Sequence, residues 1–315
     1  MTGDITTVSR ALTDSAFENA VLSEIEHIFD FCENNTDKIR KDIEKAGFSC
    51  TYCGRCCQRE EADNSVFLLP QEIEKIENAS GLNRTDFILP LFPDFYTKDD
   101  VSSIRIEVKR FAEIVKSIPD RIDEEGRIHT FGWMLQRDES GRCIFLNSDS
   151  VGAVRLVGSA EFVKTAGANE ITASAGANET AESVGAAGPA GIKRCGIYDV
   201  RPGLCQTYPF YLVENGIEDC QCEGLSRSSK TDTAVSNELT QAVMKRLLAE
   251  QDDLLRTRQY VKTECEQVLF NTERGLENAL NDLKAGVLKF IVYDGRGIHH
   301  TKIRIPEFES LPEFE

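Results

Sequence analysis

The chain has 315 residues, enough for a full hydrophobic core, and eleven cysteines, an odd number that cannot all pair within one chain. Asp and Glu outnumber Lys and Arg by 53 to 36, giving a formal charge of −17 that argues against binding nucleic acid or anionic lipid. No basic start precedes an apolar run, and no apolar run is as long as a bilayer is wide. We therefore expect no signal peptide, no membrane insertion and a cytoplasmic location, where cysteines serve metals or catalysis.

Residues 1–47 are expected to form an N-terminal helical region. One apolar stripe with steps of three and four residues predicts a first helix and consists of Phe17, Val21, Ile25, Ile28 and Cys32. Cys32 lies on that stripe and is interpreted as a core residue. Ile39 and Ile43 predict a second helix, and Gly47 follows it where a C-terminal cap belongs.

Four cysteines lie within eight residues, in the stretch FSCTYCGRCCQ: Cys50, Cys53, Cys56 and Cys57. Three of them share the Cys-x-x-Cys step, and the fourth directly follows the third. This spacing places several thiolates at the mouth of one tight loop, close enough to bind a single soft metal centre. Gly54 allows the backbone to turn there.

After this loop, Ser65–Leu69 predicts a short buried strand, and Pro70 opens a helix that turns Ile73 and Ile76 inward and ends at Gly81.

Alternating apolar residues over Arg127–Leu146 predict a β-hairpin with its turn at residues 138–141. The hairpin would return Cys143 towards the core. Trp133, the only tryptophan, is interpreted as a core residue or as a cover over the metal site.

Residues 147–193 are rich in Ala, Gly, Ser and Thr, and we interpret them as a flexible insertion because they offer little apolar surface to bury. In RCGIYDVRPGLCQTYPFYL, Asp199 is expected to cap a short helix that Pro209 ends. That helix would point Cys205 inward. Cys195 precedes it, and the stretch DCQCEG adds Cys220 and Cys222.

Residues 227–315 are expected to form a C-terminal helical region with a tail. Apolar stripes predict helices throughout 232–292, including Val287 and Ile291, and place Cys265 in the core. Asp294-Gly295 predicts a turn, and His299-His300 are expected to be solvated.

Setting aside Cys32 and Cys265 leaves nine candidate metal ligands: Cys50, Cys53, Cys56, Cys57, Cys143, Cys195, Cys205, Cys220 and Cys222. Two four-thiolate sites need eight thiols, so the count favours two ions, two clusters or one polynuclear centre. Zinc and iron–sulfur are the candidates. The abundance of thiolates favours iron–sulfur, of the 4Fe-4S kind that ferredoxins hold with a Cys-x-x-Cys-x-x-Cys run, although Cys57 directly after Cys56 departs from that run.

Four motifs in order resemble the YkgJ-type cysteine-cluster family, also called the CxxCxxCC proteins and described as zinc- or iron-chelating. They are Cys50-x-x-Cys53-x-x-Cys56-Cys57, Gly141-x-Cys143-Ile-Phe145-Leu146, Cys195-x-Ile197-Tyr198-x-x-Arg201-Pro202-x-x-Cys205-x-x-Tyr208-Pro209 and Cys222-x-Gly224. The resemblance implies metal binding by the cysteines of these motifs, with Cys220 or Cys222 or both. The long insertion between Leu146 and Cys195 departs from the family's short connection.

These observations predict an α+β fold with a cysteine-rich metal-binding core over residues 48–226 and helices on both sides. The leading hypothesis is a metal-binding protein, with an iron–sulfur centre and an unidentified protein partner or electron donor or acceptor. One alternative is an enzyme, either redox or similar to flagellin lysine methylase, as some relatives of the family are called. The other is a structural zinc protein.

Overall fold

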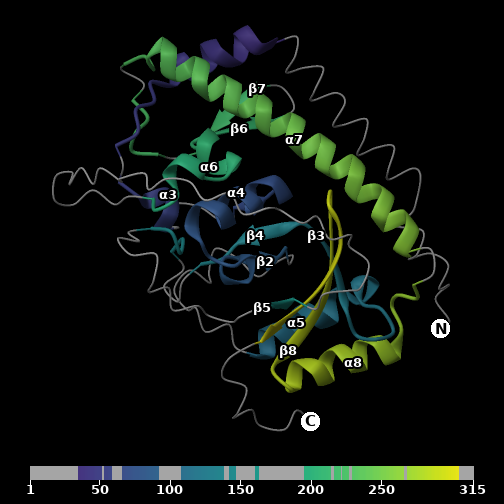
Figure 1. Cartoon of the computed structure of the whole chain (residues 1–315). Coiled ribbons are helices and arrows are strands. Elements are labelled where there is room, and N and C mark those ends of the chain that lie inside the picture. Colours follow the sequence, from purple (N-terminus) through teal and green to yellow (C-terminus); the bar gives the residue numbers. More distant parts are fainter. Residues whose placement is uncertain are drawn as a thin grey trace, which may run out of the picture.

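The computed structural model of the protein describes residues 35–51, 53–58, 66–91, 108–137, 142–146, 160–162, 195–213, 216–220, 222–226, 229–265 and 268–304. These residues mix helices with three small sheets, which confirms the predicted α+β class (Figure 1). None of the described helices combines the length and the apolar character that crossing a membrane requires.

The second predicted N-terminal helix is confirmed over residues 35–46. Its inward residues Ile39 and Ile43 are 1% and 0% exposed and pack against Phe210 and Leu239, far along the chain. Gly47 follows with φ 67°, a conformation that glycine adopts without strain. The first predicted helix and Cys32 lie outside the described residues.

A three-stranded antiparallel sheet has the order β1-β4-β2, with β1 at Phe67–Leu68, β2 at Ile88–Pro90 and β4 at Trp133–Leu135. The helix α4 (Pro70–Ser80) follows β1 directly and buries Ile73 and Ile76. Gly81 ends this helix in the left-handed conformation. The predicted strand and helix are both confirmed here.

The predicted hairpin over Arg127–Leu146 is confirmed only where Arg137 and Cys143 form an antiparallel bridge; its turn at residues 138–141 lies outside the described residues, and the pairing expected for the strand before it is wrong. β3 (Ile128–Phe131) and β4 are separated only by Gly132, whose φ of 76° turns the chain from one sheet into another. Alternation of apolar residues predicts a strand but not the strand with which it pairs. Here β3 pairs with β8, and β4 pairs with β1 and β2. A single antiparallel bridge between Arg137 and Cys143 is what brings Cys143 back.

The four-stranded sheet has the order β3-β8-β9-β5, with β8 at Val287–Asp294, β9 at Gly297–Arg304 and β5 at Ala160–Phe162. β3 runs parallel to β8, and the other neighbours are antiparallel. β5 lies inside residues 147–193, the segment that the sequence predicts to be a flexible insertion.

The prediction that a helix includes Val287 and Ile291 is also wrong. β8 is a central strand buried on both faces: Phe290 and Val292 belong to the main core, whereas Ile291 and Tyr293 belong to a second core beside α7 (Thr233–Cys265). A run that is apolar at nearly every position matches a helical stripe as well as a buried strand, which is why the pattern misled.

The predicted turn at Asp294-Gly295 is confirmed, since it joins β8 to β9. The two histidines are not solvated as expected, because both lie in β9 and are partly buried. His299 Nε2 lies 2.9 Å from the Asp294 carboxylate, which also accepts a 2.8 Å hydrogen bond from the Trp133 indole. Trp133 is 3% exposed and is a core residue.

The remaining helices surround the sheets: α5 (Val108–Ser117), α7 and α8 (Glu273–Lys284). α7 and α8 confirm the predicted helical pattern over their own residues, but residues 268–272 between them are not helical. Cys265 ends α7 at 2% exposure, so its predicted core position is confirmed. α7 runs diagonally across the whole molecule and packs against both β8 and α6 (Gly203–Thr207), as Figure 1 shows.

A nearly buried ion pair joins three helices, with the Arg246 and Glu72 side chains 7% and 12% exposed. The guanidinium of Arg246 in α7 lies 2.9 and 2.8 Å from the two carboxylate oxygens of Glu72 in α4. The same carboxylate accepts a 2.7 Å hydrogen bond from the backbone N–H of Gly203, at the start of α6. A Cβ on Gly203 would lie 2.7 Å from the Arg246 side chain, so only glycine fits there.

A second buried polar chain crosses the core behind β8. Tyr293 hydroxyl lies 2.8 Å from His129 Nδ1 and 3.6 Å from Cys265 Sγ, and His129 Nε2 lies 3.1 Å from the Asp123 carboxylate. Burial by itself raises the pKa of Asp123, but hydrogen bonds from His129 and Arg127 outweigh it and hold that pKa below the ordinary 3.8.

Replacing Arg246 by Met should destabilise the protein by about 3–5 kcal/mol, because the Glu72 carboxylate then stays buried without its cation. The free energy of unfolding in urea measures this loss. The matched control is Arg256→Met on the same helix, whose pair with Asp252 is exposed on both sides and should contribute no more than about 0.5 kcal/mol. Equal losses in both variants would contradict the role given to Arg246.

Replacing Asp123 by Asn should lower stability at neutral pH by on the order of 2 kcal/mol, because hydrogen bonds to a charged acceptor are lost. Because the pKa of Asp123 is lower in the folded than in the unfolded state, its charge stabilises the fold at pH values above 3.8. This stabilisation is lost as the pH falls through 3.8 and below. The gap in melting temperature between parent and variant should therefore shrink on acidification. The exposed Asp120→Asn is the control, and a gap independent of pH would refute the linkage.

Candidate metal centre

The clustered cysteines turn around Gly54, which has φ 73°, and enter the one-turn helix α3 (Arg55–Gln58). The backbone N–H of Cys57 donates to the Gly54 carbonyl at 3.0 Å and closes the turn. The sulfur atoms of Cys56 and Cys57 lie 3.8 Å apart. Neighbours in the chain thus present their thiols to the same side.

Cys143 and Cys195 join this loop from distant parts of the chain. Cys143 N–H donates to the Cys57 carbonyl at 2.7 Å, and the two side chains are hydrogen-bonded to each other. Next along the chain, Leu146 forms an antiparallel bridge with Cys195, and Gly196 N–H donates to the Phe145 carbonyl at 2.7 Å. Backbone pairing therefore connects three cysteine-bearing segments in series.

Cys205 and Cys220 come from α6 and from the end of a two-stranded hairpin, β6 (Phe210–Val213) and β7 (Gly216–Asp219). The hairpin reverses the chain, so that Cys220 N–H donates to the Pro209 carbonyl at 3.0 Å. The Tyr208 hydroxyl is hydrogen-bonded to the Cys220 sulfur.

Asp199 does not cap α6 as predicted. It lies in a separate 3₁₀ turn, η4 (Tyr198–Val200), and the N-cap of α6 is Pro202. The carboxylate that receives the first free N–H of α6 belongs to Glu72, a residue more than a hundred positions earlier, and sequence spacing gave no sign of it.

Cys222 lies in a turn packed against the start of the cysteine loop. Ser49 N–H donates to the Gly224 carbonyl at 2.8 Å, and a Cβ on Gly224 would lie 2.5 Å from the Ser49 oxygen. Arg55 and Glu223 add an ion pair at 2.8 Å across the same junction. Gly224 N–H also donates to the Cys222 sulfur at 3.4 Å. The last predicted cysteine thus returns to the first cluster.

Burial and mutual repulsion keep these thiols protonated. The hydrogen bond to Cys143, with burial, raises the pKa of Cys57 to about 12, and the hydrogen bond to Cys57 raises the pKa of Cys56. Burial, followed by the charges of Cys57 and Cys195, raises the pKa of Cys205. Burial, followed by Cys53 and Cys220, raises that of Cys222. Low-pKa nucleophiles need the opposite environment.

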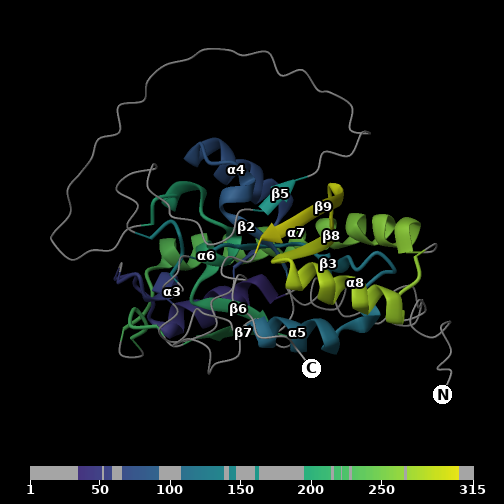
Figure 2. The same cartoon turned by 90° about the horizontal axis from the view of Figure 1, so that it is seen from below.

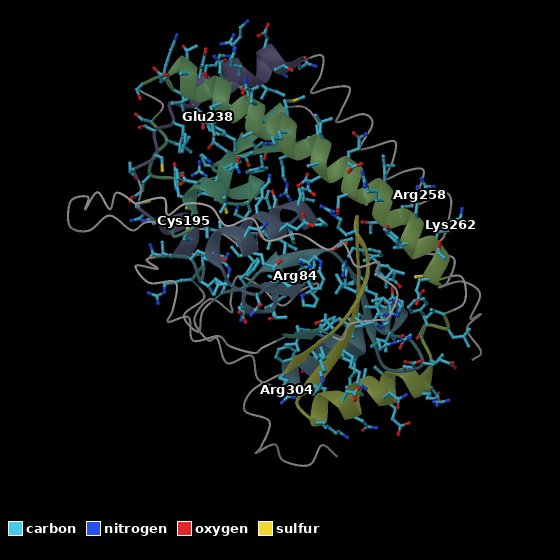
Figure 3. All side chains as sticks on the ribbon, viewed as in Figure 1. Arg84, Cys195, Glu238, Arg258, Lys262 and Arg304 are labelled. Carbon is cyan, nitrogen blue, oxygen red and sulfur yellow. The ribbon has the colours of Figure 1, made fainter. Side chains whose placement is uncertain are left out.

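One positive charge lies beside the sulfurs. Arg201 favours the thiolate of Cys195, although burial still holds the pKa of that thiol above its ordinary value. The Arg201 guanidinium stacks 4.1 Å from the centre of the Tyr198 ring, which is 40% exposed. The cysteine-bearing elements α3 and α6 gather at one end of the molecule, away from α8, in both Figures 1 and 2. Figure 3 labels Cys195 at that end.

Eight of the nine predicted ligands interact with at least one other thiol, through a hydrogen bond or through charge repulsion. The ninth, Cys50, is exposed. The 3.8 Å between the sulfurs of Cys56 and Cys57 equals the spacing of about 3.8 Å that two bonds of about 2.3 Å at the tetrahedral angle give. Over the described residues, however, no three Cys, His, Asp or Glu side chains stand in an arrangement that could hold a metal ion. The chemistry of the donors fits a soft metal, but a complete ligand set is not formed.

Several residues of this region had no signal in the sequence. Glu72 acts through contacts with Gly203 and Arg246, which follow it by more than a hundred positions, and the pair Arg55–Glu223 joins two loops. Arg201 and Tyr208 belong to the motif that carries the family resemblance, and that motif was the one available sign of their place beside the thiols.

Comparison of the chain with protein-family models, with curated proteins and with solved structures finds no match in any of the three.

Replacing Cys205 or Cys143 by Ser should remove most of the bound metal and lower the melting temperature of metal-loaded protein, because metal-binding energy is folding energy. Elemental analysis and thermal unfolding measure both effects. Cys265→Ser is the matched control: this thiol is buried beside Tyr293, away from the others, so the variant should lose stability but keep its metal. The same metal content in all three variants would sink the assignment.

Proposed function

We propose that this protein holds a thiolate-ligated metal centre, most simply an iron–sulfur cluster, among the converging cysteine segments. The observation that carries the proposal is the chain of contacts Cys56–Cys57–Cys143, extended by backbone pairing to Cys195. The ligands come from the nine cysteines predicted from the sequence. Cys56, Cys57, Cys143 and Cys195 form this chain of contacts, and Cys205 interacts with three of them.

A metal explains the thiols better than a disulfide or a nucleophile does. A disulfide needs sulfur atoms about 2.05 Å apart, and Cys56 and Cys57 are 3.8 Å apart. A nucleophilic cysteine needs a lowered pKa, and the pKa of Cys57 is raised to about 12. Bound metal cations stabilise thiolates directly and so reverse the effect of burial.

Iron–sulfur is preferred over zinc because the thiols are so many. Two four-thiolate centres, either clusters or zinc ions, would account for eight of them, and ligand sets made of cysteine thiolates alone are the rule for iron–sulfur clusters. Zinc remains the second candidate, favoured by the 3.8 Å spacing of Cys56 and Cys57 that a tetrahedral ion requires. Either centre suits the CxxCxxCC family that the motifs resemble.

The surrounding residues would orient and tune the centre. Hydrogen bonds to the sulfurs shift the reduction potential of a cluster, and two donors are in place: the Tyr208 hydroxyl to Cys220 and the Gly224 N–H to Cys222. The charge of Arg201 offsets part of the negative charge of the thiolates. We infer a protein working in the cytoplasm with a protein partner or electron donor or acceptor, and assign it no reaction.

Protein purified without oxygen from cells with ample iron should contain iron and acid-labile sulfide in equal amounts and show a visible band that dithionite bleaches. EPR of the reduced sample should then give a cluster signal. Colourless protein with near-integral zinc would replace the cluster by the zinc candidate. Protein with neither metal, at full thermal stability, would contradict the proposal.

A further inference from the structure

The outer face of α7 carries a seam of exposed residues spaced by three and four. We call it the α7 seam; its members are all exposed and are Glu238, Gln241, Lys245, Leu248, Asp252, Leu255, Gln259 and Lys262. Steps of three and four keep side chains on one side of a helix, as in the contact line of a coiled coil. The opposite face of α7 already packs in the core, through residues such as Leu239, Val243 and Val261.

The charges of the α7 seam are complementary to those of a second α7 seam that runs antiparallel to it. Glu238 is the first member and Lys262 the last, so the midpoint lies at residue 250. About a twofold axis at that midpoint, Glu238 lies level with Lys262 of the partner subunit, and Gln241 lies level with Gln259 of the partner subunit. Figure 3 shows Glu238 and Lys262 near opposite ends of α7.

The charged residues at the two ends of the seam form no ion pair within the described part of the chain. Glu238, Lys245 and Lys262 form no ion pair with any described residue, in contrast to Asp252, which pairs with Arg256. In a parallel pairing Glu238 would face Glu238 and Lys262 would face Lys262, which is repulsive. The charge order therefore selects the antiparallel arrangement.

The middle of the seam carries two exposed leucines with Asp252 between them, and it borders a hollow that Thr36 and Gln71 of neighbouring helices also line. Leu248 is 49% exposed and Leu255 is 43% exposed. A cavity of about 610 Å³ opens beside Leu248, between Gln241, Lys245 and Asp252. In the antiparallel arrangement Leu255 of the partner subunit lies level with Lys245, at this cavity, and would enter it as a knob enters a hole.

We propose that the α7 seam binds the α7 seam of a second copy of this chain, antiparallel and about a twofold axis near residue 250. The contact from Glu238 to Lys262 covers 25 residues of helix, a length of about 36 Å at 1.5 Å per residue. Two leucines from each subunit would pack at its centre, and a Glu–Lys pair would close each end. The cysteine-bearing ends of the two subunits would then point in opposite directions.

Analytical ultracentrifugation of the full-length protein tests the proposal. The parent should sediment with twice the 35.2 kDa mass of the chain and dissociate on dilution. Glu238→Lys should raise the dissociation constant at least about tenfold, because it makes two like-charge contacts in a symmetric dimer. Lys262→Glu should do the same. The double variant E238K/K262E should recover the parent's affinity, which a general loss of stability would not.

Leu255→Glu should give monomers, and Leu269→Glu is its matched control because Leu269 is 50% exposed but lies outside α7. Circular dichroism of each variant shows that the fold is kept. A parent that is monomeric at every concentration overturns the proposal. So does a monomer in which a carboxyl–amine crosslinker joins Lys262 to the chain's own residues 14–34, which would assign the seam to that segment.

Discussion

The buried pair of Glu72 and Arg246 is the constraint on which the arrangement of this protein depends. It holds α7, the longest of the described helices, against α4, and the same carboxylate accepts the first N–H of α6, which carries Cys205. The Glu72 carboxylate has a third donor in the backbone N–H of Leu69, at 2.9 Å. Sliding of these helices is therefore unfavourable, because it would leave a nearly buried charge without its partners. The position of Cys205 beside the other thiols thus follows from an ion pair that contains no cysteine.

The cysteine region brings together thiol groups whose deprotonated forms repel one another. Burial and neighbouring thiols raise the pKa values of Cys56, Cys57 and Cys205, so deprotonating several of them together requires a cation among them. Backbone hydrogen bonds from Cys143, Gly196 and Cys220 keep the segments together before any metal arrives. A metal entering such a pocket would release protons and tighten the junctions that the backbone has already formed.

Local features of the fold could be predicted from the sequence, and pairings over long distances could not. Pro70 and Gly81 mark the ends of α4 because their backbone preferences are local. The partner of β3 is a strand about 160 residues later, and no pattern within the chain names it. The continuous apolar run of β8 satisfies helix and strand alike. For the site, the spacing of the cysteines selected the candidate ligands and the motif of the family resemblance included Tyr208, whereas the role of Glu72 emerged only once the chain was folded.

X-ray absorption at the edge of the bound metal tests the central claim most directly, because it reports the atoms that touch the metal whichever metal is present. A first shell of sulfur alone, at about 2.3 Å, is the result that a thiolate-ligated centre requires. A first shell of nitrogen or oxygen at about 2.0–2.2 Å would contradict the account, because it would place the metal away from the cysteines.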